Sequence, residues 1–293
     1  IAENDEKLME KYLEAGALSP EEVEAGLKKA VRERQLFPVY AASAAVNIGA
    51  QPLVQGFIGL LPSPVERGEV KAQVKGADGS VKPSPDEPFS GLVFKTISDP
   101  YTGRISLIRV FSGKINPDSV VANVNKGVDE KLGGLFFLQG KEQIPAGQVR
   151  CGDICATAKL KATSTGDTLS AKGADIMFEP IKFPEPSISF AIEPKTRADE
   201  DKLSNGIHKL MEEDAMLRFF RDEQTKEFLI AGTGQQHIEV TVSKLKKRFH
   251  TEVNLKAPKV PYRETIRGRL GHGRIRSVPR HPDIGSVLGG RIW

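Results

Sequence analysis

A run of small residues, from Ala41 to Ala45, is the first feature of the sequence that could do binding chemistry. It lies in the stretch PVYAASAAVNIGAQPL, residues 38–53, where a predicted strand, residues 36–43, leads into a predicted helix, residues 51–61. Open α/β sheets place their ligands at the carboxyl ends of strands. Two interpretations fit: a close-packed turn, or a loop whose backbone N–H groups approach a planar ligand and need small side chains to do so.

Other residues with reactive side chains form weaker patterns. Cys151 and Cys155 have no nearby histidine with which to complete a four-ligand zinc site, so we interpret them as reduced structural thiols. The segment TSTGDTL, residues 163–169, lacks the Gly-Lys-Ser/Thr of a phosphate loop and is predicted to be a turn. His237 stands near a predicted helix start with no serine, cysteine or metal set beside it, which favours a structural or contact role over catalysis.

The positive charge is concentrated at one end of the chain. Of the formal net charge of +4, residues 263–293 carry +5, from seven arginines against Glu264 and Asp283, so residues 1–262 carry −1. An RNA contact in the body must therefore come from a local patch. The best candidate is the run KLKKRFH, which is equally consistent with a solvated helix face; its basic residues are Lys244, Lys246, Lys247 and Arg248.

The length of 293 residues suggests two or three domains, and proline-containing stretches separate three blocks. Residues 1–65 contain predicted helices, one of them with Ser19 as N-cap, Pro20 at its first position and Glu22 three residues after the cap. One strand and three helices cannot bury a core, so we expect this block to be the end of an α/β domain that continues upstream. No segment is apolar enough to span a membrane and the amino end is acidic, so a cytoplasmic protein is predicted.

The second and third blocks have clearer periodicities, which together predict a multidomain α+β protein. Residues 66–182 hold five short β-rich runs with glycine and aspartate turns, which favours a barrel; the runs are 89–98, 103–113, 119–124, 132–138 and 152–159. Residues 183–262 show the order βαββαβ of a ferredoxin-like domain. Its two helices have apolar stripes formed by Leu203, Ile207, Leu210 and Met211, and by Ile238, Val242, Leu245 and Phe249.

Four stretches resemble the second and third domains of bacterial elongation factor G and its close paralogues, in the family's order over residues 1–267. They are FKTISDPYTGRISLIRVFSGKI, GDICATAKLKATSTGDTLS, FPEPSISFAIEPKTRADEDKLSNGIHKLMEEDAMLRF and APKVPYRETI. The resemblance implies the end of a P-loop GTPase domain in residues 1–65, a translation-factor β-barrel in 66–182, a ferredoxin-like third domain in 183–262, and in 263–293 the start of a fourth domain.

The same resemblance assigns a role to the small-residue run. It implies that Ala42, Ser43 and Ala44 form the loop that reads the guanine base, with a backbone N–H donating to the base carbonyl oxygen. The family's phosphate loop, switch segments and Asn-Lys-x-Asp motif are not in this sequence, so the loop is an incomplete site. The stretch GTGQQHIEV also departs from the family's Gly-Met-Gly-Glu-Leu-His-Leu-Glu, at Thr233, Gln235 and Gln236, which together with Pro261 suggests a paralogous branch.

The function implied by the resemblance is that of a translational GTPase moving transfer RNA and messenger RNA on the ribosome. GTP and Mg²⁺ are expected in the full-length parent, whereas this part of it is expected to hold no cofactor or metal and to be catalytically inactive. The implied partners are the ribosome and ribosomal RNA. No membrane contact is expected, and the protein is expected to be a monomer. Two alternatives stay open: a ribosome-protection GTPase of the tetracycline-resistance type, and a non-enzymatic ribosome- or RNA-binding module.

The carboxyl-terminal tail stops resembling the family soon after Ile266. Its scattered arginine, proline and glycine residues show no strand or helix period. Arg274 to Ser277 can be encoded as CGC ATA AGA AGC, which read two bases on gives His-Lys-Lys, the residues that the family has there. We therefore hypothesise that a shifted reading frame created the tail.

Overall fold

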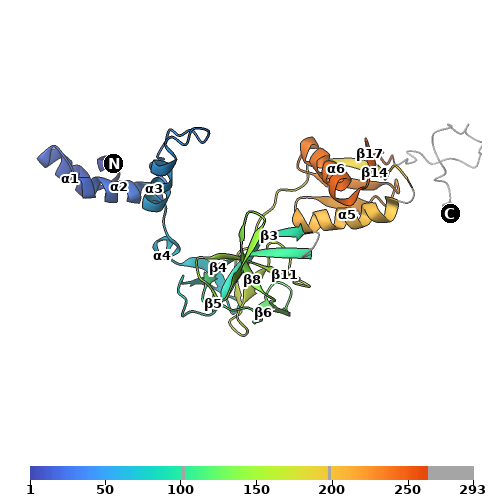
Figure 1. The fold of residues 1–293 in the computed structure, drawn as a ribbon, viewed down its shortest axis with the longest axis horizontal. Helices are drawn as coiled ribbons and strands as arrows, with labels where there is room; N and C mark the ends of the chain where they lie inside the picture. Colours follow the sequence, from blue (N-terminus) through green and yellow to red (C-terminus); the bar gives the residue numbers. More distant parts are fainter. Residues whose placement is uncertain (100–102, 197–198, 263–293) are drawn as a thin grey trace, which may run out of the picture.

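The chain forms three parts in sequence order, a helical amino-terminal part, a β-rich middle part and an α/β carboxyl-terminal part (Figure 1). This computed structural model describes residues 1–99, 103–196 and 199–262. The predicted start of a fourth domain and the frame-shift hypothesis concern residues 263–293 and lie outside the described residues. Within the described ranges, no helix combines the length and the apolar character needed to cross a membrane.

The amino-terminal part consists of η1 (Ala2–Asn4), α1 (Glu6–Ala15), α2 (Pro20–Arg32), α3 (Ala50–Leu60) and α4 (Pro64–Arg67). The predicted start of α2 is confirmed: the Ser19 side chain accepts from the Glu22 N–H, and the Glu22 carboxylate accepts from the Ser19 N–H at 2.9 Å. A second capping box, between Ser63 and Glu66, begins the short helix α4. Sequence reasoning took residues 62–64 only as a helix terminator and missed it.

The predicted strand at residues 36–43 is wrong. The segment has no regular secondary structure apart from one isolated bridge between Ser43 and Ile48, and Phe37 and Val39 are 75% and 94% exposed. A strand needs a hydrogen-bonded neighbour, and among the described residues no strand pairs with residues 36–42. The β-branched and aromatic residues that suggested a strand therefore have no sheet to join.

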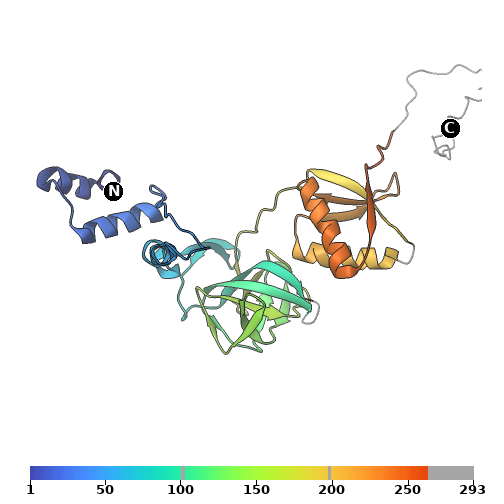
Figure 2. The ribbon, with the colours of Figure 1, turned by 45° about the horizontal axis from the view of Figure 1, so that its top comes forward.

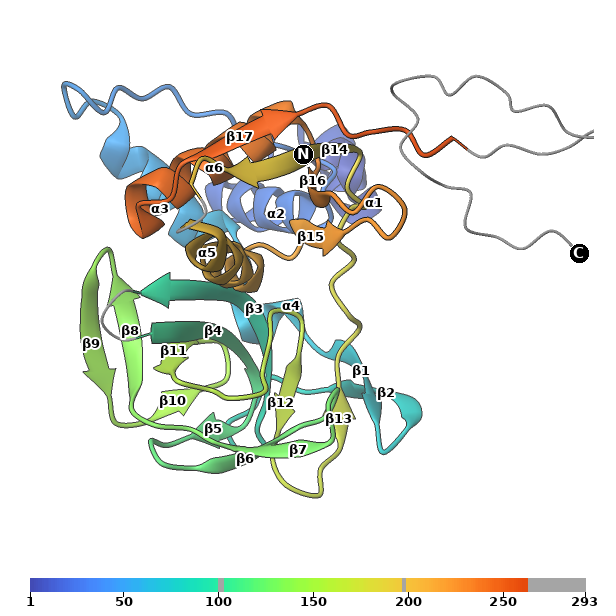
Figure 3. The ribbon, with the colours of Figure 1, turned by 90° about the vertical axis from the view of Figure 1, so that its right-hand side faces the viewer.

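The middle part contains thirteen strands in its described residues, arranged mainly in one eight-stranded antiparallel sheet of order β7-β6-β12-β3-β4-β11-β8-β9. Figure 3 shows the sheet curling around itself, and strands from both ends supply one apolar core that includes Val121 and Leu135. The strands β1 to β13 are Val70–Val74, Ala77–Val81, Ser90–Asp99, Gly103–Ser112, Lys114–Ile115, Val120–Asn123, Val128–Lys131, Leu135–Gln139, Glu142–Ala146, Val149–Arg150, Ile154–Ala158, Thr168–Ser170 and Ile176–Met177.

All five β-rich runs predicted in this part contain strands of the sheet: β3, β4, β6, β8 and β11. The β1–β2 hairpin was not predicted. It pairs with β13 in a separate three-stranded sheet, and its exposed positions are polar or small, so its apolar pattern is weak. A second small sheet pairs β10 with β5.

The carboxyl-terminal part has the predicted βαββαβ order: β14 (Ile188–Pro194), α5 (Glu200–Glu213), β15 (Arg218–Arg221), β16 (Phe228–Gly232), α6 (Gln235–Phe249) and β17 (Val253–Lys256). The sheet order is β15-β16-β14-β17, with all pairs antiparallel. The apolar stripe of α5 and, apart from Val242, that of α6 pack into one core with Ile192 and Ile230, which confirms the ferredoxin-like fold.

The middle and carboxyl-terminal parts are joined by residues 178–187, which contain Pro180, Pro184 and Pro186 and no helix or strand. Figure 2 shows this linker running between the two parts as an extended coil. The two parts also touch directly, where α5 lies against the end of β3 (Figure 3). The linker and this contact set how the two parts are held.

Candidate functional site

The predicted guanine loop, Ala42, Ser43 and Ala44, forms an exposed turn between residues 36–42 and α3. The Ser43 N–H donates to the Ile48 carbonyl at 2.8 Å, and the Ile48 N–H donates to the Ser43 carbonyl at 3.1 Å. This bridge closes a turn over residues 44–47. Within the described part of the chain, the N–H groups of Ala44, Ala45 and Val46 donate to no protein acceptor, so the turn leaves three backbone donors unbonded.

Gly49 holds this turn against the chain that precedes it, and sequence reasoning missed it. Its φ is +75°, and a Cβ at this position would lie 2.4 Å from the Ala41 carbonyl oxygen and 3.0 Å from the Ala42 Cα. Both the left-handed conformation and the close backbone approach require glycine. The signal was available, since a glycine directly before a predicted helix marks either a cap or a tight approach.

An apolar surface surrounds the turn and continues along α3. Val54, Phe57 and Ile58 are 49%, 54% and 77% exposed, and Ile48 in the turn is 67% exposed. Only Leu60 of α3 is buried. A helix that is apolar on several sides is usually covered, so this helix presents an apolar surface next to the candidate base loop.

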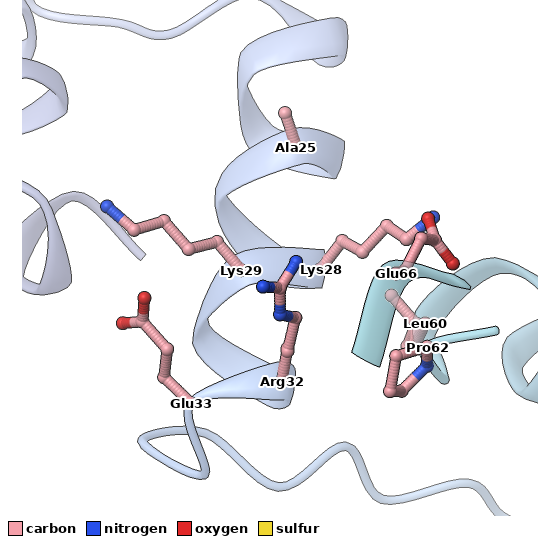
Figure 4. Close-up of a pocket in the computed structure, with 8 residues that line it drawn as sticks. All are labelled: Ala25, Lys28, Lys29, Arg32, Glu33, Leu60, Pro62 and Glu66. Carbon is pink, nitrogen blue, oxygen red and sulfur yellow. The ribbon is translucent and has the colours of Figure 1, made fainter. Parts of the chain in front are cut away.

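A cavity of about 440 Å³ lies elsewhere in the amino-terminal part, between α2, the end of α3 and α4 (Figure 4). Lys28, Lys29 and Arg32 of α2 line it, opposite Leu60 and Pro62. The Lys28 Nζ lies 2.6 Å from Glu66 Oε1, and the pKa of Glu66 falls to about 2 because of the Lys28 hydrogen bond and the capping bonds with Ser63. None of the residues 42–44 lines this cavity, so it is not the predicted base site.

The predicted RNA-binding turn of α6 contains two basic residues that are bound to carboxylates and two that are not. Lys246 Nζ lies 2.8 Å from Glu252 Oε1, and Arg248 forms two hydrogen bonds with Glu213. Lys244 and Lys247 are exposed and, in the described ranges, have no ion-pair or hydrogen-bond partner for their side chains. Their spacing of three places both ammonium groups on one side of the helix.

His237 has a position that favours the structural interpretation. Its Nδ1 accepts from the Thr233 N–H at 3.2 Å, so its Nε2 carries the proton and donates to Asp214 Oδ2 at 2.9 Å. Asp214 Oδ1 in turn accepts from the Met216 N–H at 3.0 Å. These bonds tie the start of α6 to the end of α5, and both ring nitrogens are used.

A buried acid that sequence reasoning missed organises the loop of residues 160–167. Glu130 of β7 is 5% exposed, and its carboxylate accepts from the backbone N–H groups of Lys161, Ala162 and Thr163 at 3.2, 2.6 and 2.9 Å and from the Thr163 hydroxyl at 3.0 Å. Burial by itself raises the pKa of Glu130, but these hydrogen bonds outweigh burial, and the pKa lies below its usual range. Of the predicted turn at 163–169, Thr163 is held by this carboxylate, whereas Thr168 and Leu169 belong to β12.

The two cysteines are free thiols, as predicted. Burial raises the pKa of Cys155 to about 12, with the charge of Asp153 adding to the effect. A thiol with such a pKa is not a nucleophile at neutral pH. In the described residues, no group of three or more histidine, cysteine, aspartate or glutamate side chains is arranged to hold a metal ion.

Comparison with known proteins agrees with this fold. The family description "Elongation factor G domain 2" matches residues 88–172, and "Elongation Factor G, domain III" matches residues 183–257. Among solved structures, a crystal structure of a Thermus thermophilus protein is similar, with a TM-score of 0.72 and 31% sequence identity. The similarity covers 89% of this chain and 37% of that one. The chain therefore belongs to the elongation factor G-like family, of which it carries domains II and III.

Proposed function

We propose that this chain is part of a translational GTPase that acts on the ribosome and promotes the movement of transfer RNA and messenger RNA. The observation that carries the proposal is the succession of domains II and III in one chain, matched over residues 88–172 and 183–257. A fold by itself does not fix a function, but here two different domains of one factor occur together. The similarity to the Thermus thermophilus protein extends over 89% of this chain, so a chain of similar structure occurs in a second protein.

In this proposal the amino-terminal part contributes to a guanine-nucleotide site. The Ala44 N–H is the donor to the base, and the turn closed by Ser43 and Ile48 positions it. The rest of a nucleotide-binding domain covers the apolar surface of α3, and GTP with Mg²⁺ binds in the full-length protein. Phosphoryl transfer needs a phosphate-binding lysine and a positioned water, which other parts of that protein supply.

Contact with ribosomal RNA is assigned to α6. Lys244 and Lys247 have ammonium groups with no carboxylate partner among the described residues, whereas Lys246 and Arg248 are bound to Glu252 and Glu213. An RNA phosphate can approach the first pair without breaking an ion pair. We therefore narrow the four-residue prediction to Lys244 and Lys247 as the principal contacts.

Ribosome-stimulated hydrolysis of GTP by the full-length gene product tests the proposed activity. We expect slow hydrolysis by the protein alone and strong stimulation by 70S ribosomes. Translocation of peptidyl-tRNA, measured with puromycin, then separates a translocase from a ribosome-protection factor, which releases tetracycline without advancing the messenger RNA. The absence of any ribosome-stimulated hydrolysis contradicts the proposal and favours a non-enzymatic binding module.

A further inference from the structure

Polar contacts join domains II and III between the end of β3 and the facing surfaces of α5 and α6. The Ser98 N–H donates to Glu213 Oε1 at 2.8 Å, and the Ser98 carbonyl accepts from Arg248 Nη2 at 2.6 Å. Both polar groups of the Ser98 backbone are therefore bound by side chains of domain III. Ser98 lies 115 residues before Glu213 in the chain, so these contacts are entirely tertiary.

The two domain III side chains are also bound to each other. Arg248 Nη1 lies 2.8 Å from Glu213 Oε2 and Arg248 Nη2 lies 2.9 Å from Glu213 Oε1, a fork-to-fork pair. The side chains of Glu213 and Arg248 are only 14% and 32% exposed. The hydrogen bond to Glu213 raises the pKa of Arg248, burial opposes that rise, and the charges of Glu213 and Asp99 add to it. The two side chains are thus preorganised to bind both the N–H and the carbonyl group of Ser98.

A second contact lies beside the first. Arg104 of β4 has Nη1 3.8 Å from Glu212 Oε1, the residue before Glu213. The same guanidinium donates to the carbonyl oxygens of Leu160 and Lys161. Arg104 therefore connects α5 of domain III to the loop that Glu130 holds through its amide groups.

In the described residues, no apolar core includes side chains from both domains. The main core of domain II and the core of domain III share no residue, and each draws all its members from its own domain. The chain passes from one domain to the other through the linker of residues 178–187. Domains joined by a small polar interface are expected to move relative to each other unless specific contacts hold them.

We propose that Glu213 and Arg248 form an ionic clasp, which binds the backbone of Ser98 and fixes the angle between domains II and III. The ion pair between Arg104 and Glu212 is a second part of the clasp. When the clasp opens, domain III turns about the linker as a rigid body. The clasp is a releasable contact because its bonds are exchangeable for bonds to water, ions or another charged surface, which a packed apolar interface does not allow. This inference does not depend on nucleotide or ribosome binding.

Pulsed electron paramagnetic resonance distances on the whole chain test the clasp. Spin labels are placed at Lys141→Cys in domain II and Lys226→Cys in domain III, in a Cys151→Ala background that leaves the buried Cys155. We expect one narrow distance peak in the parent. We expect this peak to be lost in Glu213→Gln and in Arg248→Lys, because lysine keeps the charge but lacks the guanidinium that forms two parallel hydrogen bonds. The matched control is Glu193→Gln, which removes an ion pair to Lys256 inside domain III and is expected to keep the narrow peak.

The parent protein supplies a second measurement that needs no clasp variant. At about 1 M potassium chloride the Debye length is about 3 Å, and we expect the narrow peak to broaden as the ion pairs weaken. Circular dichroism at each salt concentration verifies that both domains stay folded. The clasp is overturned if the peak stays narrow in the folded variants or, should a variant not fold, if it stays narrow in the parent at high salt.

Discussion

The Glu130 carboxylate lies against the backbone of Ala162, with Oε1 2.6 Å from the Ala162 nitrogen. The two residues belong to different segments of domain II, the strand β7 and the loop of residues 160–167. The carboxylate accepts three N–H groups of one loop, much as a helix N-terminus is capped by a side chain. The loop therefore depends on a buried charge.

Replacing Glu130 tests this dependence. Glu130→Gln places an amide NH₂ where an acceptor is needed, so we expect a loss of about 3 kcal/mol in the free energy of unfolding. The exposed Glu142→Gln in β9 is the matched control, expected to change it by less than about 0.5 kcal/mol. Urea unfolding followed by far-UV circular dichroism measures both. A Glu130→Gln variant as stable as the control contradicts a stabilising role for the carboxylate.

The pH dependence of the same pair of proteins gives an independent check. The folded-state pKa of Glu130 is lowered from 4.5, so its contribution is fully present above pH 4.5 and is lost as the pH falls through the folded value. The difference in stability between parent and Glu130→Gln should therefore shrink on acidification. A difference that grows as the pH falls has the opposite sign and contradicts the lowered pKa.

Alanine substitutions at Gly49 and Gly16 distinguish the cost of backbone strain from the cost of a steric conflict. Both have positive φ, +75° and +74°, but a Cβ at Gly16 meets no atom within 4 Å, whereas one at Gly49 meets the Ala41 carbonyl. Gly16→Ala should cost about 1 kcal/mol, the penalty for a left-handed alanine. Gly49→Ala should cost more and shift the NMR amide signals of Ser43 and Ile48. Equal costs with unmoved signals show that the close approach at Gly49 does not matter.

The pKa of Glu252 reports whether Lys246 is engaged. Hydrogen bonds from Lys195 and Lys246 lower this pKa to about 2. Carboxyl ¹³C titration should show it rising most in Lys195→Gln, rising in Lys246→Gln, and nearly unchanged in Lys244→Gln, a control that removes the same charge from the same helix. If Lys246→Gln leaves the titration unchanged, Lys246 is as free as Lys244, and the division of the basic turn fails.

Nucleotide binding by this chain should be weak. In the proposed site the Ala44 N–H would contribute only a base contact, and no phosphate-loop sequence occurs in the 293 residues. We expect a dissociation constant for GTP no lower than about 1 mM, equivalent to about 4 kcal/mol. Isothermal titration calorimetry measures it, with ATP as the control for base selectivity. Micromolar binding of GTP contradicts this account of an incomplete site.

Local sequence signals predicted a large part of this fold. The capping box at Ser19 and Glu22 and the apolar stripe from Leu203 to Leu210 depend on residues three to seven apart, and both are present in the structure. The strand at residues 36–43 was wrong because strand character alone does not supply a pairing partner. Strand propensity describes which segments can form a strand, and a strand forms only where a neighbouring strand is available for pairing.

The contacts of the charged side chains were less predictable because they join residues that are distant in the chain. Glu213 and Arg248 are 35 residues apart, and both reach Ser98, so no local pattern pointed to their pairing. The charge of Arg248 suggested RNA, but the structure gives that charge a carboxylate partner. Periodicity placed the basic residues on one helix correctly, and only the tertiary fold shows which of them are already paired.

The salt dependence of binding to 70S ribosomes tests the central claim most directly. We expect the chain to co-sediment with ribosomes, with log K falling linearly with log salt concentration. Lys244→Gln with Lys247→Gln should reduce that slope by about 2, since each phosphate contact releases about 0.9 counterion on duplex. Lys7→Gln with Lys141→Gln removes the same charge elsewhere and should leave the slope unchanged. Absence of ribosome binding by the folded chain contradicts the proposed function, and equal slopes for the two double variants contradict α6 as the RNA-contacting surface.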